Sequence, residues 1–323
     1  MNKNHPVEED IDLASLFENW LAETEAEIES KQKQNLRVQT GIKIVDTILA
    51  GGFRPEQLVI LGGTPAVGKT TFILQIAMYN AIQGNRVGIW EVEMSAVELL
   101  KRVLANYTHV RLHELTDPTA ETLAYIKSKV QENYTEFATM LSNIRIHVSS
   151  RDTKPQILEK CDQYGYSLLI FDYLQRFGSM DPRRPYLPDL RQKIETNVSI
   201  LKEIAVMYKA VVLAVSALNR ESMKNGISIT AFRESSDIEY AADVIMTLST
   251  AIQRKNGEWE EATNTEISDV RAENANQVVL LKIMKCKHYK EGKCLLNFWR
   301  NYQKFGAHVT RDPMELLVPT PDD

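Results

Sequence analysis

The residues best suited to chemistry form one glycine-containing run, Gly63-Thr64-Pro65-Ala66-Val67-Gly68-Lys69-Thr70. The run has the spacing G-x-x-x-x-G-K-[ST] that is typical of a phosphate-binding loop, or P-loop. Its glycines allow backbone N–H groups to turn inward around an anion. Lys69 would reach the β- and γ-phosphates of a nucleotide, and the hydroxyl of Thr70 would bind Mg²⁺. The run therefore predicts binding of a nucleoside triphosphate together with Mg²⁺.

The sequence on either side of this loop supports that interpretation. Residues 58–61 are an apolar run typical of a buried strand, and residues 70–78 carry apolar side chains at helical spacing. Strand, loop and helix are the arrangement that phosphate binding requires, because the helix N-terminus adds its partial positive charge. A simple glycine turn is the alternative, and the Lys-Thr pair argues against it. The expected nucleotide contacts are Gly63, Thr64, Pro65, Ala66, Val67, Gly68, Lys69, Thr70 and Thr71.

Two further carboxylates follow apolar strands. Asp172 ends the run at residues 167–172, where a carboxylate can hold Mg²⁺ beside the loop, although an aspartate there can also cap a turn. Glu93 follows the strand predicted at residues 87–92, and can orient and activate the water that attacks a γ-phosphate. Glu91 points to the same face of that strand and is a rival. We favour Glu93 because it lies nearer the strand tip.

Strands and helices alternate along most of the chain, which predicts the frame that positions these residues. The predicted strands are residues 58–61, 87–92, 144–148, 167–172, 210–215, 242–248 and 277–281. The predicted helices are 96–105, 155–164 and 191–208, and a mostly helical stretch after the first of them is clearest at residues 121–143. Nearly all-apolar strands indicate an α/β fold with a mostly parallel sheet covered on both faces. Ligands of such sheets bind at the carboxyl ends of the strands. The polar residues 253–275 are expected to form a surface excursion.

Composition places the chain among ordinary globular proteins. It has 323 residues, of which 44% are hydrophobic and 25% charged, and a net charge of −5. This charge argues against a surface coated with basic residues, yet a groove can still concentrate positive charge for nucleic acid. The three cysteines form neither a disulfide framework nor a zinc pattern. No signal peptide or membrane-spanning run is recognisable, so we expect a cytoplasmic protein without membrane contact.

Before the core, residues 9–33 carry one apolar stripe at helical spacing. The stripe consists of Leu13, Leu16, Phe17, Trp20, Leu21 and Ile28. Such a face can pack on its own domain or on a neighbouring subunit, and the residues alone do not decide between these. The expected organisation is a disordered start with an amphipathic helix in residues 1–37, an α/β nucleotide-binding domain in 38–310, and a flexible acidic tail in 311–323.

Several segments together resemble the ATPase domain of DnaB-type hexameric replicative helicases, a branch of the RecA-like proteins. They occur in the family's order and span residues 38–305. They are Thr40-Gly41 with Gly51-Gly52, the P-loop, Glu93-Met94-Ser95, Phe171-Asp172-Tyr173-Leu174-Gln175, Ser216-Ala217-Leu218-Asn219-Arg220, and Phe232-Arg233-Glu234-Ser235-Ser236-Asp237-Ile238-Glu239 followed by Ala242-Asp243-Val244-Ile245. The resemblance implies a RecA-like fold, ATP bound between neighbours in a ring usually of six subunits, and single-stranded DNA threaded through the ring. It also implies that the N-terminal helix is a linker or oligomerisation helix and that residues 38–310 form a RecA-like ATPase domain, and it allows a loader or another replication protein as partner.

The resemblance also suggests where DNA would bind. The channel-facing loop of the family matches Arg233, Glu234, Ser235 and Ser236. An arginine and backbone N–H groups can follow phosphates without reading bases. Arg183 and Arg184 follow the Asp172 strand, and are either additional phosphate contacts or a solvated charge pair.

This chain departs from the family pattern in three places. Ala217 replaces a glutamine that senses the γ-phosphate and couples it to the DNA loop in the family. The family's Lys-x-Arg run, which ends in the arginine finger, reads Lys285-Cys286-Lys287 here, so Lys285 is expected to contact nucleotide and Lys287 to take the catalytic place of the finger. Lysine supplies charge without the planar two-pronged donor. Residues 1–37 are also too short to hold the family's helical N-terminal domain, its usual docking surface for primase.

These features predict an Mg²⁺-dependent ATP hydrolase that acts as a DNA helicase or translocase on single-stranded DNA. The alternative is a RecA-like ATPase that assembles with ATP and serves as a switch or scaffold without unwinding DNA. Ala217 and Lys287 motivate that alternative, because both substitutions affect the parts that convert nucleotide binding into motion.

Overall fold

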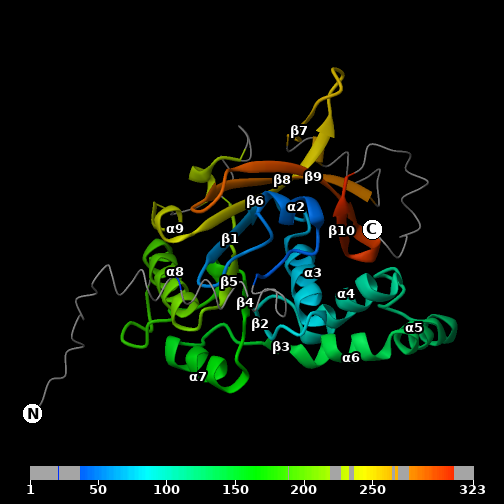
Figure 1. Ribbon diagram of the computed structural model, residues 1–323, viewed down its shortest axis with the longest axis horizontal. Helices are drawn as coiled ribbons and strands as arrows, with labels where there is room; N and C mark the ends of the chain where they lie inside the picture. The colour runs from blue at the N-terminus through cyan, green and yellow to red at the C-terminus, as the bar shows by residue number, and fades with distance from the viewer. Residues whose placement is uncertain are drawn as a thin grey trace, which may run out of the picture. The chain divides into compact units, whose positions relative to one another are not determined.

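One extended sheet carries the candidate site. The computed structural model describes residues 21, 37–187, 189–218, 227–232, 236–263, 266–267 and 276–308. The chain divides into a unit of residues 1–37 and a unit of residues 38–323. In the described part of the second unit, a 10-stranded sheet has the order β10-β9-β8-β6-β1-β5-β4-β2-β3, with β7 paired to β6 outside this path (Figure 1).

The parallel part of the sheet is formed by six strands, and antiparallel strands extend one edge. The strands are β1 (Leu58–Gly63), β2 (Val87–Glu91), β3 (Ile144–His147), β4 (Leu168–Asp172), β5 (Val211–Val215), β6 (Val244–Gln253), β7 (Trp259–Glu261), β8 (Asn276–Cys286), β9 (Gly292–Trp299) and β10 (Lys304–Ala307). Strands β1 to β6 pair in parallel, whereas β8, β9, β10 and β7 pair antiparallel with their neighbours.

Helices precede and connect the parallel strands. They are α2 (Lys43–Ile48), α3 (Lys69–Ile82), α4 (Ala96–Thr108), α5 (Ala120–Glu132), α6 (Tyr134–Asn143), α7 (Lys154–Tyr164), α8 (Leu190–Met207) and α9 (Ser236–Ala241), with short 3₁₀ turns η1 (Leu174–Arg176), η2 (Ile229–Ala231) and η3 (Arg300–Tyr302). Ser95 caps α4 through a reciprocal capping box with Glu98, which explains where this helix begins.

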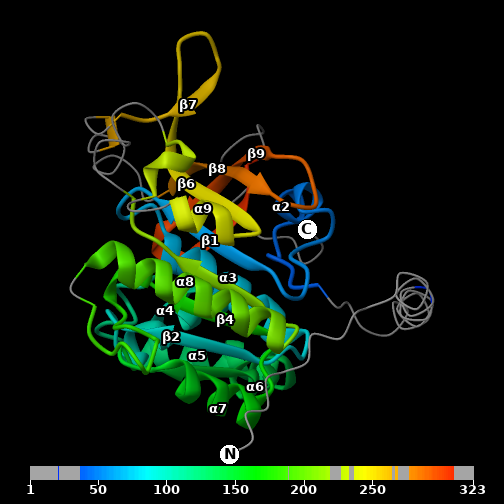
Figure 2. The ribbon, with the colours of Figure 1, turned by 90° about the vertical axis from the view of Figure 1, so that its left-hand side faces the viewer.

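Two hydrophobic cores cover the two faces of the sheet. Along β1, Val59 and Leu61 enter the core that contains α3, α4 and α6, whereas Leu58 and Ile60 enter the core that contains α7, α8 and α9. Because successive side chains of a strand point to opposite faces, a strand buried on both faces must be apolar throughout. This confirms the mostly parallel α/β sheet covered on both faces. Figure 1 shows α8 and α3 on the two sides of β1 and β4, and Figure 2 views the molecule from the α8 side.

The strand predicted at residues 277–281 lies within β8, but its antiparallel pairing and the strands β9 and β10 were not predicted. Strands β9 and β10 carry no continuous apolar run, because Lys293 and Asn297 alternate with the inward-facing Cys294, Leu296 and Phe298. Residues 253–275 were expected to be a surface excursion, and their described beginning agrees with this. There β6 extends to Gln253 and pairs with β7 in a hairpin that projects from the sheet (Figure 1).

The mostly helical stretch predicted over residues 121–143 consists of two helices, α5 and α6, which are separated at Asn133. The linker helix predicted in residues 9–33 lies outside the described residues except at Leu21, and the predicted tail in 311–323 lies entirely outside them. Among the helices that are described, none has the length and apolar character needed to cross a lipid bilayer.

Candidate nucleotide site

The phosphate loop joins β1 directly to α3. Gly68 adopts a φ of 97°, a left-handed conformation that strains residues with a side chain. A Cβ at this position would also lie 2.8 Å from the Phe305 ring and 2.9 Å from the Phe298 ring. Glycine is therefore needed here both for the turn and for close packing. Helix α3 begins at the next residue, Lys69, so its unpaired N–H groups face the loop.

Within the loop, polar groups are arranged to receive an anion. The Lys69 ammonium donates to the carbonyl oxygens of Gly63 and Thr64 at 2.9 and 3.0 Å, which folds it over the loop. The buried Thr64 hydroxyl has no hydrogen-bond partner among the described residues. Thr64 does not line the cavity beside the loop, so this hydroxyl is not offered to a ligand there. The Lys69 ammonium and the N–H groups at the start of α3 are the groups that suit phosphate oxygens.

Thr70 and Asp172 bring two oxygen ligands together. The Thr70 hydroxyl donates to Asp172 Oδ2 at 2.7 Å, and Asp172 is 5% exposed at the end of β4. Burial raises the pKa of Asp172, while the Thr70 hydrogen bond and the Lys69 charge oppose that rise. No group of three or more His, Cys, Asp or Glu side chains suited to a metal occurs among the described residues. A hydroxyl and one carboxylate fit Mg²⁺, which is usually held by one or two carboxylates plus substrate phosphates and water.

The two rival glutamates have different surroundings. Glu93 lines the cavity beside the loop, is partly exposed, and forms an ion pair with Arg176 at 3.1 Å. Glu91 is buried, and its Oε1 accepts from the backbone N–H groups of Glu93 and Met94 at 2.7 and 3.1 Å. Burial and the nearby Asp172 charge raise the pKa of Glu91 to about 7. Glu91 thus holds the turn that carries Glu93, and of the two glutamates only Glu93 lines the cavity.

Arg102 was missed by the sequence analysis. It projects from α4 into the same cavity, which has a volume of about 580 Å³ and also contains Lys69 and Asp172. Its Nη1 donates to the Gln303 Oε1, which also accepts from the Thr71 hydroxyl at 2.7 Å. Burial lowers the pKa of Arg102, although nearby carboxylates oppose this. The cavity therefore contains a guanidinium from the same chain, fixed by a buried glutamine.

Ala217 also lines this cavity, at the point where β5 has ended. Its backbone N–H donates to Gln175 Oε1 at 3.1 Å, and Gln175 Nε2 donates to the Ser216 hydroxyl at 3.0 Å. Gln175 thus connects the segment after β4 to the segment after β5. The methyl side chain of Ala217 can make no hydrogen bond to a ligand.

A family model described as the DnaB-like helicase C terminal domain matches residues 37–307. The chain belongs to this family. The replicative DNA helicase DnaC of Bacillus subtilis (strain 168) is 27% identical over 287 residues, which are 83% of this chain and 56% of that protein. The replicative DNA helicase DnaB of Geobacillus stearothermophilus is 26% identical over 297 residues, which are 87% of this chain and 59% of that protein. The chain covers less than two thirds of the length of these curated relatives.

Solved structures agree with this assignment at the level of the fold. One solved structure, described as an ATPase domain, has a TM-score of 0.72 at 21% identity, covering 91% of this chain and 99% of that chain. A structure of a DnaB-like replicative helicase, described with its interactions with primase, has a TM-score of 0.70 at 22% identity, covering 93% of this chain and 68% of that chain. The predicted family and RecA-like fold are thereby confirmed.

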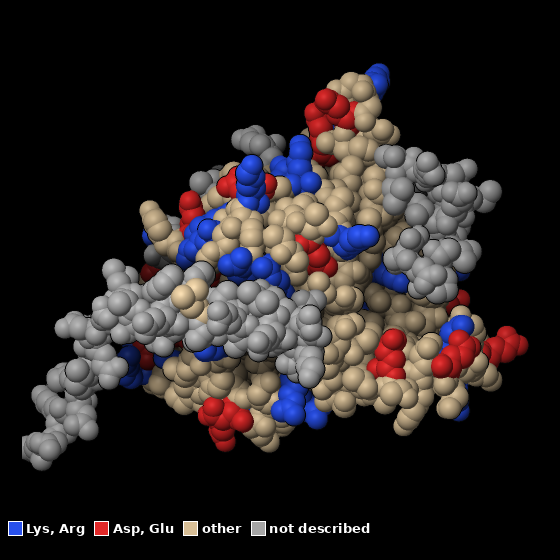
Figure 3. Space-filling model, in the orientation of Figure 1, with Lys and Arg blue, Asp and Glu red and all other residues tan. Residues whose placement is uncertain are grey.

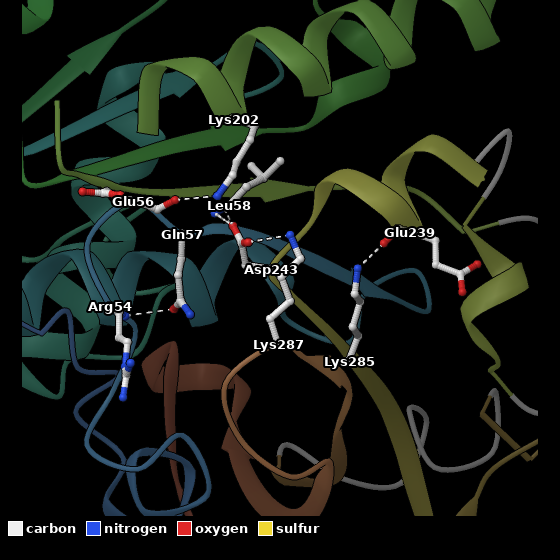
Figure 4. A network of polar contacts seen from close by, with 9 residues as sticks. All are labelled: Arg54, Glu56, Gln57, Leu58, Lys202, Glu239, Asp243, Lys285 and Lys287. Atoms are coloured by element: carbon white, nitrogen blue, oxygen red, sulfur yellow. Dashed lines mark hydrogen bonds and ion pairs between the residues drawn. The ribbon is translucent and has the colours of Figure 1, made fainter. Parts of the chain in front are cut away.

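The two lysines at the place of the family's finger run lie far from the chain's own P-loop. Cys286, between them, is level with Val244, which pairs with Val59 near the start of β1. The P-loop follows the opposite end of β1. Lys287 donates to Asp243 Oδ1 at 2.9 Å, and Lys285 donates to the carbonyl oxygen of Glu239 (Figure 4). Neither lysine lines the cavity that contains Lys69.

The candidate DNA contacts are only partly described. Arg233, Glu234 and Ser235 lie outside the described residues, and Ser236 is described only as the first residue of α9. Arg183 and Arg184 are exposed and both pair with Asp181, at 3.6 and 3.1 Å. They belong to a separate cavity between the start of α7 and the middle of α8. The structure does not bring them to the P-loop.

Proposed function

We propose that this chain is an Mg²⁺-dependent ATP hydrolase that acts as a helicase or translocase on single-stranded DNA within a ring. The observation that carries this proposal is the contact of Thr70 with Asp172, beside a P-loop whose Lys69 closes over the phosphate position. This arrangement belongs to a chain of the DnaB-like helicase family, whose relatives include proteins named replicative DNA helicase.

In this proposal the P-loop and Lys69 bind the triphosphate, and Thr70 and Asp172 hold Mg²⁺. The metal, when bound, neutralises charge on the phosphate oxygens. Glu93 orients a water molecule and accepts its proton, because its carboxylate faces the cavity and is in contact with solvent. Arg102 adds a guanidinium from the same chain, which stabilises charge that develops on the phosphoryl group.

Completion of the site requires a second subunit. Lys285 and Lys287 lie at the ends of the strands opposite the P-loop, so they cannot reach nucleotide in their own chain. In a ring, these strand ends would face the P-loop of a neighbour. We therefore propose a homo-oligomer, a hexamer in keeping with the family, in which Lys287 acts as a finger and Lys285 as a nucleotide contact. The segment of residues 9–33 would strengthen this assembly by packing on a neighbour.

DNA binding is proposed for Arg233, Glu234, Ser235 and Ser236, on the strength of their match to the family's channel loop. Arg183 and Arg184 are weaker candidates, because each already pairs with Asp181. A loader or another replication protein, and a cytoplasmic location, also remain part of the proposal.

Strand displacement tests this function. The full chain is incubated with a forked DNA duplex, ATP and Mg²⁺, and the Lys69→Ala variant serves as a control that lacks the phosphate-binding ammonium. We expect displacement by the natural chain alone. Absence of displacement together with absence of DNA-stimulated ATP hydrolysis would contradict the proposal.

A switch or scaffold ATPase is the second candidate, favoured by the methyl group of Ala217 in the cavity. Size measurements with and without a non-hydrolysable ATP analogue would distinguish the two. ATP-dependent assembly without affinity for single-stranded DNA would favour the switch.

A further inference from the structure

Asp243 is a buried aspartate with two lysine partners, next to the start of β6. It is 4% exposed. Its Oδ2 accepts from Leu58 N at 2.8 Å and from Lys202 Nζ at 2.6 Å, while its Oδ1 accepts from Lys287 Nζ at 2.9 Å (Figure 4). One oxygen therefore anchors the carboxylate to β1 and α8, and the other holds the lysine that follows β8.

The backbone fixes the same geometry. Asp243 N donates to Leu58 O at 2.9 Å, and Lys287 N donates to Asp243 O at 3.0 Å. Because main chain and side chain are both tied, the carboxylate cannot follow Lys287 if that side chain moves. The carboxylate acts as a fixed point against which the lysine ammonium is placed.

The cluster carries more positive than negative charge. Burial acts to raise the pKa of Asp243, but hydrogen bonds from Lys202, Lys287 and Leu58 outweigh it and leave the pKa below its ordinary value. The ionised carboxylate thus faces two ammonium groups. Lys285 stands beside them and donates to the neutral carbonyl of Glu239. Figure 3 shows Lys and Arg side chains gathered on this face over α9 and the β8–β9 turn.

Lys287 can serve a second partner without leaving Asp243. An ammonium group has three donors, and the bond to Asp243 uses one of them. The Lys287 side chain is 41% exposed, so part of it faces outward at the end of β8. A phosphate brought to this end of the strand by another molecule could accept from the remaining donors.

The chemistry of lysine explains why such a fixed point is needed. Arginine presents a rigid planar fork, whereas a lysine ammonium sits on a flexible four-carbon stem and loses more freedom for each hydrogen bond that it forms. Misplacement of a catalytic group by about 1 Å can lower a rate by about 10²-fold. A lysine in the finger position therefore gains from a fixed partner.

We infer that Asp243 is the positioning residue for Lys287, and that it directs the Lys287 ammonium toward the phosphates of a nucleotide held by a neighbouring subunit. Lys202 holds the carboxylate in place for this task. The inference rests on the proposed ring with nucleotide between subunits.

Asp243 could instead act within its own chain. It binds Leu58 at the start of β1, and β1 leads to the P-loop at its other end. A change at Asp243 would then disturb nucleotide binding by the same subunit. The test must separate this effect in the same chain from an effect on the neighbour.

The first measurement is the ATPase kcat of the assembled full chain at saturating Mg²⁺-ATP. Asp243→Asn keeps an acceptor oxygen for Leu58 N and removes the charge that holds Lys287. We expect Asp243→Asn to lower kcat about tenfold to a hundredfold. Lys287→Ala should lower kcat at least as much. The double variant should be no slower than Lys287→Ala alone. Asp152→Asn is the matched control, because Asp152 is also buried and bonded to a lysine, Lys160, and it should keep its kcat.

Mixed rings give the decisive readout. Asp243→Asn subunits retain an intact P-loop, and Lys69→Ala subunits retain an intact Lys287. Mixing the two should restore hydrolysis at each interface where a Lys69→Ala subunit presents Lys287 to the intact P-loop of an Asp243→Asn subunit. If Asp243 acts only through β1, mixing restores nothing, and the inference is overturned. It is also overturned if Lys287→Ala slows hydrolysis while Asp243→Asn does not.

Misfolding of the variant and failure of the proposed function can each be distinguished from failure of the inference. If Asp243→Asn fails to fold, Lys202→Met loosens the carboxylate without removing it, and kcat should fall severalfold; an unchanged kcat would count against the inference. If the natural chain neither assembles nor hydrolyses ATP, the proposed function itself fails, and the inference fails with it.

Discussion

Glu91 of β2 lies directly opposite Asp172 of β4 in the parallel register, so two carboxylates meet at the tips of adjacent strands. Only Asp172 bonds to the P-loop threonine. Glu91 accepts from the N–H groups of the following turn, which carries Glu93 into the cavity. Under the proposed function, Asp172 would bind the metal and Glu93 would contact the attacking water, whereas Glu91 supports the turn.

This division predicts different results for two isosteric changes. Glu93→Gln removes the proton acceptor, so kcat should fall by about 10²-fold or more while ATP binding stays intact. Glu91→Gln keeps an oxygen for the two N–H groups and should cost much less. Single-turnover hydrolysis and equilibrium binding of a labelled nucleotide measure both. Full turnover in Glu93→Gln with loss in Glu91→Gln would assign the base to Glu91.

Asp172→Asn should make hydrolysis require more Mg²⁺. An amide oxygen attracts a divalent cation less than a carboxylate does, whereas its size still allows the Thr70 contact. The Mg²⁺ concentration that gives half-maximal ATPase rate should rise, and a chelator should stop hydrolysis in the natural chain. Asp152→Asn, remote from the P-loop cavity, is the control. An unaltered Mg²⁺ dependence in Asp172→Asn would exclude Asp172 as a ligand.

Arg102 should contribute to the chemical step more than to binding. Arg102→Ala removes a cation from the cavity and is expected to lower kcat by about tenfold to a hundredfold, with a smaller change in KM. Gln303→Ala removes the acceptor that holds the Arg102 guanidinium, and should lower kcat less. Steady-state ATPase kinetics separate the two parameters. A change confined to KM in Arg102→Ala would mean that this arginine only binds nucleotide.

Ala217→Gln tests the departure from the family pattern. The added amide would enter the cavity that Ala217 lines, where it can both donate and accept hydrogen bonds. We expect stimulation of ATP hydrolysis by single-stranded DNA to increase, while the rate without DNA changes little. Ala217→Leu adds similar bulk without an amide and serves as the control. If single-stranded DNA stimulates ATP hydrolysis equally in both variants, the missing amide at position 217 does not explain the coupling of ATP hydrolysis to DNA.

Much of this site could be predicted from the sequence because its signals are local. Gly68, Lys69 and Thr70 adjoin one another, and Asp172 ends a strand that reads as apolar because both of its faces are buried. Arg102 and Gln303 gave no such signal, since their contact joins residues 201 positions apart. The contact between Arg102 and Gln303 depends on how α4 packs on the turn before β10, and no sequence pattern predicts that packing.

The antiparallel edge escaped prediction for a related reason. Strand β9 is half-exposed, so its polar and apolar residues mix, and its pairing with β8 is set by the fold as a whole. The surroundings of Lys285 and Lys287, at the end of β8, could not be predicted for the same reason. Lys287 could be aligned with the finger position, but its pairing with Asp243 and, through it, with Lys202 could be seen only in the structure.

The ATPase rate with and without single-stranded DNA tests the central claim most directly. The measurement uses the full chain at saturating Mg²⁺-ATP, with Lys69→Ala as the inactive control. The account predicts hydrolysis that rises when single-stranded DNA is added and disappears in Lys69→Ala. A rate that single-stranded DNA leaves unchanged, from a chain that assembles with ATP, would contradict it.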